Sequence, residues 1–365
     1  GGHGGRGGAP ARARVAGGVG AALDAAVGGG ALSEEQVAAL FRARGAAFDE
    51  VCSAADAMRR SQAGGAVGYV VNRNINYTNV CELSCAFCAF SKGERGAPGG
   101  ERHYLLPLVE VERRAAEAWA RGATEVCMQG GVHPSFDGEA YVELLRAAKR
   151  GAPGIHVHAF SPLEVSHGAQ SLGVPVGDFL LRLRDEGLGS LPGTAAEVLD
   201  SRVREQLCPD KLSAEGWLGV VEAAHRAGLR TTSTVMFGHV DGDGPHAWAR
   251  HLLQLAALNR RTGGITEFVP LPFVHHEAPV FRRGLARKGP TLREAVLMHA
   301  VGRLVLGPAG VRNVQASWVK MGPDMAPHLL RAGANDMGGT LMDESITRAA
   351  GAEHGTELAP EEMEA

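Results

Sequence analysis

The sequence predicts an α/β fold of the (β/α)8 TIM-barrel type with an N-terminal helical extension. From residue 67 onward, eight short strand-like segments alternate with amphipathic stretches. Several of these stretches end in glycine, which is typical of helix C-termini. Polar residues stand at the ends of the strand-like segments, where a parallel barrel keeps its active site. A doubly wound open sheet is the competing fold, and the lack of a G-x-G-x-x-G motif after the first strand disfavours it.

Composition and periodicity divide the chain into four segments. Residues 1–30 are rich in Gly and Ala, and we predict a low-complexity lead or linker there. Residues 31–66 are predicted to be helical, because Ser33 and Gln36 can form a capping box ahead of an apolar stripe. The barrel is expected over residues 67–350, and residues 351–365 are expected to form an acidic, solvated tail.

The eight strands are expected where β-branched and apolar residues run up to a polar residue or a glycine. These segments are 67–76, 124–131, 155–162, 188–194, 230–238, 266–274, 313–319 and 334–341. Helices are expected between them, for example over 108–122, 141–151 and 217–228.

The bulk composition excludes several classes of function. The 365 residues carry a net charge of −3, which argues against nucleic acid or an anionic membrane as a partner. No apolar run is long enough to span a bilayer. Cys52, Cys127 and Cys208 are irregularly spaced and are expected to be free or buried thiols in a reducing compartment. We expect the cytoplasm, or an organelle if a targeting segment precedes the first residue, which is Gly rather than Met.

Three further cysteines form a compact C-x3-C-x2-C run at Cys81, Cys85 and Cys88, just after the first expected strand. Cysteine thiolates hold iron–sulfur clusters, and three ligands leave one iron of a 4Fe-4S cluster open for chemistry. The alternatives are a zinc site completed by a distant histidine, or three unrelated thiols. Zinc sites usually combine two separated cysteine pairs, and the chain has no second pair.

The cysteine run, with Phe87 just before its last member, resembles the signature of radical S-adenosyl-L-methionine (SAM) enzymes. The resemblance implies that the open iron binds SAM, and that a reduced cluster, supplied by an electron donor, cleaves SAM to a 5′-deoxyadenosyl radical. Gln129, Gly130 and Gly131 match the segment of the family whose backbone meets the methionine amino group. Val132 stands where the family often has Glu, so this contact is expected to differ.

A wider set of segments resembles the tyrosine-using subunit, or C-terminal half, of FO synthase, which makes the chromophore of coenzyme F420. The implied reaction joins the 4-hydroxybenzyl group of L-tyrosine to 5-amino-6-(D-ribitylamino)uracil, and a second radical SAM protein or fused domain closes the ring. The segments are "VVNRNINYTNVC", "ATEVCMQGGVHP", "HVHAFSPLEV", "SLPGTAAEVLD", "TTSTVMFGHV", "TEFVPLPFVH", "SWVKMG" and "GANDMGGTLMDESITRAAGAEHG".

Two alternatives to this resemblance stay open. The radical SAM enzymes of the futalosine route to menaquinone, such as cyclic dehypoxanthinyl futalosine synthase and aminofutalosine synthase, share the barrel and much of this motif set. A non-catalytic iron–sulfur or zinc protein is the alternative from another class. It leaves the polar strand ends unexplained.

Polar residues near the expected barrel mouth are the remaining site candidates. Glu164, His239 and His275, with the adjacent His276, are candidates for proton transfer, since imidazole titrates near the working pH. Glu164 and His158 are also candidates for contact with SAM, although Glu164 can equally cap the helix that follows it.

The substrates offer hydroxyl, amide, carboxylate and ammonium groups, which need polar partners. Arg73, Asn74, Glu197, Glu267 and Asn335 are the candidates for substrate binding. Arg73 has the alternative of pairing with a barrel carboxylate.

Overall fold

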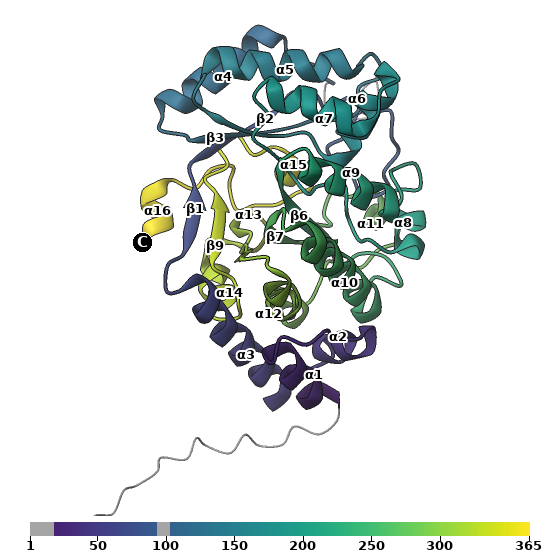
Figure 1. The fold of residues 1–365 in the computed structure, drawn as a ribbon, viewed down its shortest axis with the longest axis vertical. Helices are drawn as coiled ribbons and strands as arrows, with labels where there is room; N and C mark the ends of the chain where they lie inside the picture. Colours follow the sequence, from purple (N-terminus) through teal and green to yellow (C-terminus); the bar gives the residue numbers. More distant parts are fainter. Residues whose placement is uncertain (1–17, 93–102) are drawn as a thin grey trace, which may run out of the picture.

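Seven parallel strands form one curled sheet in the order β2–β3–β4–β5–β6–β7–β8 (Figure 1). The computed structural model describes residues 18–92 and 103–365. Each strand pairs with the next one along the chain, as successive β/α units require. The bounds are β2 Asn72–Asn76, β3 Glu125–Gln129, β4 His156–Ala159, β5 Ser190–Leu191, β6 Arg230–Phe237, β7 Ile265–Pro272 and β8 Asn313–Val314.

A separate two-stranded unit stands between the two edges of this sheet. Strand β1 (Gly68–Val70) pairs in parallel with β9 (Asp336–Gly339). Isolated bridges link the unit to its neighbours, Arg73 with Met342 on one side and Gln315 with Asp336 on the other. The predicted α/β barrel architecture is therefore confirmed, but continuous ladders join only seven strands.

Three expected strands differ from the observed ones. The segment 67–76 divides into β1 and β2 at Val71. Strand β5 is short because Pro192 follows it and has no N–H to donate to the ladder. The segment 313–319 leaves the sheet after Val314, and its end turns into helix α13 (Trp318–Met321).

The N-terminal helices α1 (Gly18–Val27), α2 (Glu34–Phe41) and α3 (Ala46–Ala63) lie together at one end of the molecule (Figure 1). Ser33 and Gln36 form the predicted capping box at the start of α2. We predicted a low-complexity lead or linker over residues 1–30. Its second part is instead helical, because α1 buries Ala22, Leu23 and Ala26. Residues 1–17 lie outside the described part of the chain.

The expected solvated tail is also corrected. It contains the short helix α16 (Pro360–Glu364), and Glu364 accepts a hydrogen bond of 2.6 Å from the Tyr69 hydroxyl on β1. Leu358 and Met363 pack against the hydrophobic core. The C-terminal residues therefore cover the outer side of the β1–β9 unit (Figure 1).

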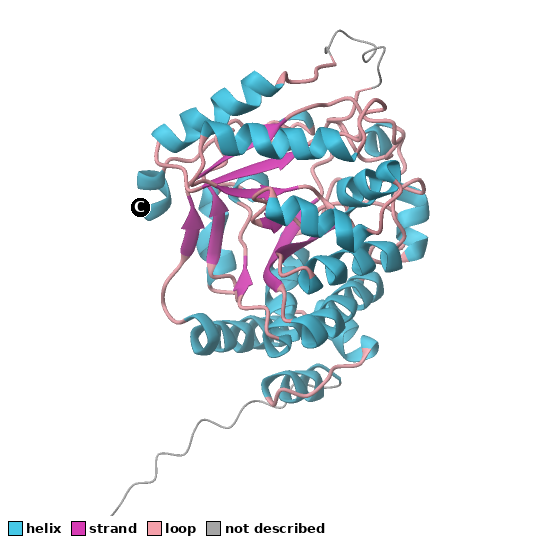
Figure 2. Cartoon of the chain, turned by 45° about the horizontal axis from the view of Figure 1, so that its top comes forward, coloured by secondary structure: helices cyan, strands magenta, loops and turns pink. Residues whose placement is uncertain are grey.

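The other helices surround the sheet and cover its outer face (Figure 2). No helix of the described residues has the length and apolar character needed to cross a membrane. The helices are α4 Leu108–Ala120, α5 Gly138–Gly151, α6 Pro162–Leu172, α7 Val176–Asp185, α8 Ser201–Leu207, α9 Ala214–Arg226, α10 Pro245–Thr262, α11 Pro279–Arg282, α12 Leu292–Leu306, α14 Ala326–Leu330 and α15 Ile346–Ala349, with 3-10 turns at Gly307–Ala309 and Pro323–Met325.

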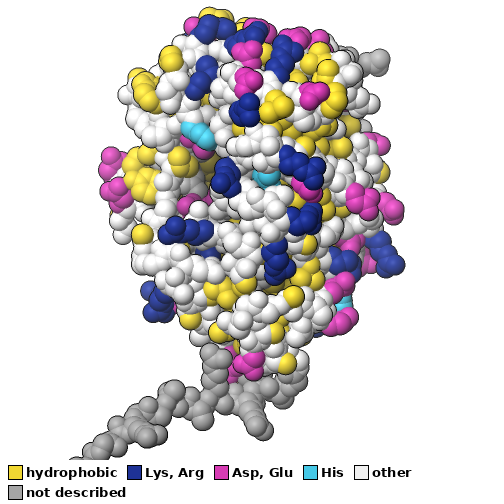
Figure 3. Space-filling model, in the orientation of Figure 1, with side chains coloured by type: hydrophobic (Ala, Val, Ile, Leu, Met, Phe, Trp, Pro, Cys, Tyr) yellow, Lys and Arg dark blue, Asp and Glu magenta, His cyan; other side chains and the backbone are white. Residues whose placement is uncertain are grey.

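Alternation along the strands separates an apolar outer layer from a polar interior. On β3, Val126 and Met128 pack in the core beneath the helices, so Glu125, Cys127 and Gln129 face inward. The same alternation turns three asparagines of β2 and two histidines of β4 inward. The interior of the curled sheet is therefore lined with groups that can bind ligands. On the outer face drawn in Figure 3, acidic and basic side chains both occur across the surface.

Candidate active site

A cavity of about 240 Å³ opens at the C-terminal ends of the strands. Its lining comes from the loops after β2, β3, β4 and β5, from the ends of β6 and β7, and from residues after α8 and in α13 and α15. Loops at this end of a parallel barrel carry the chemistry in enzymes of this architecture.

Cys81, Cys85 and Cys88 all line the cavity and form no disulfide. The Cys81 Sγ accepts a hydrogen bond of 3.3 Å from the Val132 N–H, and the Cys88 Sγ accepts one of 3.3 Å from the Ser91 N–H. Burial raises the pKa of the Cys85 thiol to about 12, so a thiolate there needs a bound cation to compensate its charge.

The donor set fits a 4Fe-4S cluster with one open iron. Three sulfurs face one cavity, and backbone N–H groups donate to two of them, as is usual around clusters. Among the described residues that line the cavity there is no fourth cysteine and no histidine. Cys208 is buried and is not part of the lining.

The Gly130–Gly131 segment packs against the cysteine loop without room for side chains. A Cβ on Gly131 would lie 2.1 Å from the Val80 carbonyl oxygen and 2.8 Å from the Cys81 Cβ. A Cβ on Gly130 would lie 2.4 Å from the Tyr77 ring. Both glycines line the cavity, so their backbone is open to a close approach by a ligand.

Glu164 lines the cavity, and both of its carboxylate oxygens accept hydrogen bonds from protein groups. Its carboxylate accepts hydrogen bonds from the Tyr77 hydroxyl, the Gly130 N–H and both the N–H and the hydroxyl of Ser161. The contacts with Ser161 form a capping box at the start of α6. Burial raises the pKa of Glu164, and these hydrogen bonds oppose the rise. Glu164 therefore holds the glycine segment in place, and its predicted proton-transfer role stays a prediction.

A buried ion pair that the sequence did not reveal, between Lys211 and Glu197, lines the same cavity as the glycines. The Lys211 Nζ is 2.7 Å from a Glu197 oxygen and 5.2 Å from the centre of the Phe87 ring. Burial lowers the pKa of Lys211, but the Glu197 charge and nearby thiols raise it more. Glu197 and Ala195 have φ values of 47° and 63°, so this turn holds non-glycine residues in the left-handed region, as functional sites often do.

Lys320 is a second cationic residue that the sequence analysis did not single out. It lines the cavity and also the neighbouring one that contains His275 and His276. Among the described residues its side chain forms no hydrogen bond or ion pair, and burial lowers its pKa. Thr194 Oγ1, also in the lining, is buried without a partner. These two groups are available to a polar substrate.

The structure brings some of the predicted residues to the cavity and not others. Phe87, Gln129 and Glu197 line it. Three other candidates, Asn74, His158 and Glu267, lie on strands below the cavity and face the sheet interior. The Asn74 Oδ1 and Glu267 Oε1 atoms are buried without hydrogen-bond partners. Burial lowers the pKa of His158 to about 4, so its ring is neutral.

Four candidates lie away from the cavity, so the expectation that they line it is corrected. Arg73 faces α4 and forms ion pairs with Glu117 and Asp343. Both ring nitrogens of His239 are engaged, by the Met236 carbonyl and the Val240 N–H. Asn335 accepts hydrogen bonds from the Arg303 guanidinium and the Val314 N–H. His275 lines the neighbouring cavity only.

Comparisons with known proteins agree with the cysteine signature. Residues 75–250 match the Radical SAM superfamily, and residues 262–360 match a family described as the CofH/MqnC C-terminal region. The chain is 50% identical to the FO synthase of Streptomyces coelicolor over 325 residues, which are 89% of this chain and 37% of that protein. It is also 50% identical to the 5-amino-6-(D-ribitylamino)uracil–L-tyrosine 4-hydroxyphenyl transferase of Methanopyrus kandleri over 314 residues, 86% of this chain and 83% of that one.

Solved structures share the fold. Methylornithine synthase superimposes with a TM-score of 0.68 at 19% identity, covering 93% of this chain and 90% of its own. The hydrogenase maturase HydG superimposes with a TM-score of 0.70 at 13% identity, covering 95% and 73%. At these identities the likeness extends to the fold alone.

Replacing Gly131 by Ala is expected to displace the loop that carries Cys81, because the new methyl group would overlap the Val80 carbonyl. The reconstituted Gly131→Ala protein should bind less iron and sulfide per chain than the wild type. Gly219→Ala is the control, since nothing lies within 4 Å of a Cβ at Gly219 in α9. Equal cluster content in the Gly131→Ala protein and the wild type would contradict the packing described.

Replacing Lys211 by Met is expected to destabilise the fold by about 3–5 kcal/mol, because it leaves the Glu197 charge buried and unpaired. The double variant Lys211→Met/Glu197→Gln should recover part of this loss, since no charge then remains. Urea unfolding of the three proteins measures the difference. If the double variant were no more stable than the single one, the pair would not be the source of the effect.

Proposed function

Because the chain belongs to the radical SAM superfamily and, within it, to the family of the 5-amino-6-(D-ribitylamino)uracil–L-tyrosine 4-hydroxyphenyl transferases, we propose that it carries out their reaction. It would join the 4-hydroxybenzyl group of L-tyrosine to 5-amino-6-(D-ribitylamino)uracil, a step towards FO. The observation that carries this proposal is a three-cysteine loop facing a strand-end cavity, in a chain half identical to such a transferase.

Two cofactors follow from the family, a 4Fe-4S cluster and SAM. Cys81, Cys85 and Cys88 would hold the cluster, and the backbone of Gly130 and Gly131 would hold the methionine part of SAM. When bound, the two cofactors supply a 5′-deoxyadenosyl radical that can remove a hydrogen atom from the substrate. Phe87 lies beside the last cluster cysteine and under Lys211, which fixes the ring at the cavity wall.

The residues of the cavity have separate tasks in this proposal. Met236, Leu271 and Phe273 form an apolar wall that excludes water from the reacting centre. The Lys320 side chain lines the cavity and pairs with no other side chain among the described residues, and it would bind the carboxylate of tyrosine. Thr194 would donate to, or accept from, a polar group of either substrate.

The partners of the chain are part of the proposal. The chain spans 37% of the length of the FO synthase of Streptomyces coelicolor. We therefore expect the ring-closing step to be carried out by a second radical SAM domain or protein, and a one-electron donor to reduce the cluster. A reducing compartment suits thiolate ligands of this kind.

The test is an anaerobic assay of the protein reconstituted with iron and sulfide, with dithionite, SAM and both substrates. Mass spectrometry should detect 5′-deoxyadenosine together with the coupled product, and both should require tyrosine and the aminouracil. The Cys85→Ala variant should fall to background. Cys52→Ala should stay active, because Cys52 lies on α3, outside the lining of the cavity.

Two results would contradict the proposal. Deoxyadenosine formed without the coupled product would leave radical SAM chemistry in place and direct attention to futalosine-type substrates. No deoxyadenosine from protein with an intact cluster would contradict the radical SAM assignment itself.

A further inference from the structure

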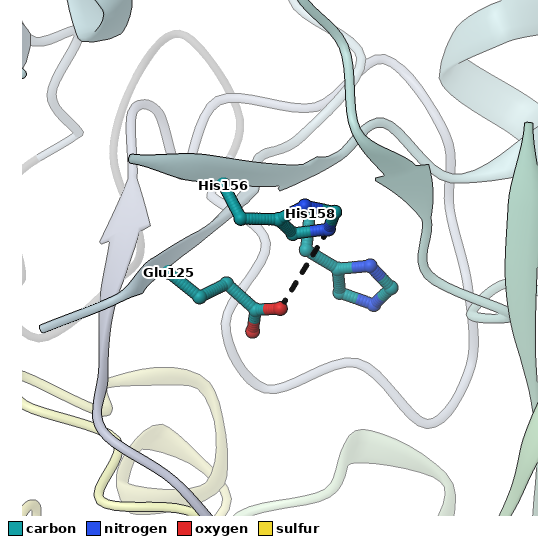
Figure 4. A group of neighbouring side chains, drawn as sticks. All are labelled: Glu125, His156 and His158. Carbon is teal, nitrogen blue, oxygen red and sulfur yellow. Dashed lines mark ion pairs between the residues drawn. The ribbon is translucent and has the colours of Figure 1, made fainter. Parts of the chain in front are cut away.

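Three side chains at the opposite end of the sheet interior lie close enough to share a metal ion. Glu125 is the first residue of β3, and His156 and His158 lie on the neighbouring strand β4 (Figure 4). One nitrogen or oxygen from each residue lies within 4.8 Å of the others. Nothing in the proposed transferase mechanism uses this group.

The strand geometry explains why these three side chains meet. His156 and His158 are two residues apart on β4, so both point to the same side of the sheet. Glu125 lies directly beside His156 in the parallel register of β3 and β4. The His156 Nε2 is 3.9 Å from a Glu125 oxygen, the ion pair marked by the dashed line in Figure 4. A histidine pair on one strand and a carboxylate on the next is a compact donor set.

The rings of His156 and His158 both contact the hydroxyl group of Ser190. The His156 Nε2 and the His158 Nδ1 each lie 2.7 Å from the Ser190 Oγ. One hydroxyl group therefore stands between both ring nitrogens. A cation near this point would take the nitrogen lone pairs in place of the hydroxyl.

Two further carboxyl groups, those of Glu267 and Asp336, lie near Glu125. Within residues 18–92 and 103–365, none of Glu125, Glu267 and Asp336 forms an ion pair with a lysine or an arginine. The Glu267 Oε1 is buried and has no hydrogen-bond partner. Carboxyl oxygens beside two imidazoles are ligand atoms that a divalent transition metal accepts.

We propose that Glu125, His156 and His158 bind one divalent transition-metal ion, such as Zn²⁺ or Fe²⁺, at the floor of the sheet interior. Two imidazoles and one carboxylate form a known ligand set for both metals, and they leave coordination positions open. The His156 side chain is 45% exposed, so an ion reaches the site from solvent. Gln129, at the other end of β3, lines the cavity that contains the three cysteines. The proposed metal site lies about 13 Å from it along the strand.

The test uses the cluster-loaded protein, dialysed anaerobically against micromolar ZnCl₂, with bound zinc measured by mass spectrometry. About one Zn²⁺ per chain should bind, and zinc X-ray absorption should show only nitrogen and oxygen neighbours at about 2.0–2.1 Å. Sulfur neighbours at about 2.3 Å would instead place the zinc on cysteines and overturn the proposal.

Variants locate the site. His156→Ala and Glu125→Gln should weaken zinc binding by roughly tenfold or more, as loss of even an outer partner of a ligand does. His246→Ala should bind zinc as the wild type does, because His246 faces Glu34 at 3.0 Å in another histidine–carboxylate pair that lacks a second histidine. Equal zinc affinity in His156→Ala and the wild type would overturn the proposal.

Misfolding of a variant can be told apart from loss of the zinc site. His156 is partly exposed, so its truncation leaves no large cavity, and circular dichroism checks that the variant is folded. If a variant does not fold, the stoichiometry and the X-ray absorption of the wild type still decide the question. The zinc readout does not depend on transferase activity, so the two proposals fail separately.

Discussion

The contact between the loop after β2 and the loop after β3 is the constraint on which the site depends. Gly131 donates to the Thr78 carbonyl, Glu82 donates to the Val132 carbonyl, and Val132 donates to the Cys81 sulfur. These bonds continue the parallel pairing of the two strands beyond their ends. They fix the first cysteine and the glycine segment relative to each other, so one contact positions both groups that would hold the cluster and SAM in the proposed function. Glu164, in the first turn of α6, accepts a hydrogen bond from the Gly130 N–H and so links this helix to the glycine segment.

The polar interior of the sheet follows from the same alternation that builds its apolar outside. The inward-facing residues on β3 begin with Glu125 at one end. They finish at the other end with Gln129, which lines the cavity that contains the three cysteines. Two chemically different regions therefore share one strand. One gathers thiols, glycine backbone and two lysines, and the other gathers imidazoles and carboxyl groups. The strand length separates them, so a ligand at either end can be bound without contact with the other.

Local spacing was enough to predict the parts of the site that lie close together in sequence. The three cysteines, the glycine pair and the Ser33 capping box depend on residues a few positions apart. Lys211 and Lys320 were missed because their place at the cavity depends on packing between distant segments. Arg73 takes its alternative of pairing with carboxylates, and alternation explains this, since it lies two residues from the outward-facing Ile75. Polarity at a strand end does not reveal which face a side chain takes, and the predicted contacts of Asn335 and His239 failed for that reason.

In the proposed function, three cysteines hold a cluster whose open iron binds SAM. Electron–nuclear double resonance on the reduced, cluster-loaded protein tests it directly, with SAM labelled by ¹⁷O in its carboxylate and ¹⁵N in its amino group. The structure predicts hyperfine coupling from both labels, since the cysteine loop and the glycine segment face the same cavity. Coupling from neither label, in protein with an intact cluster, would contradict the account.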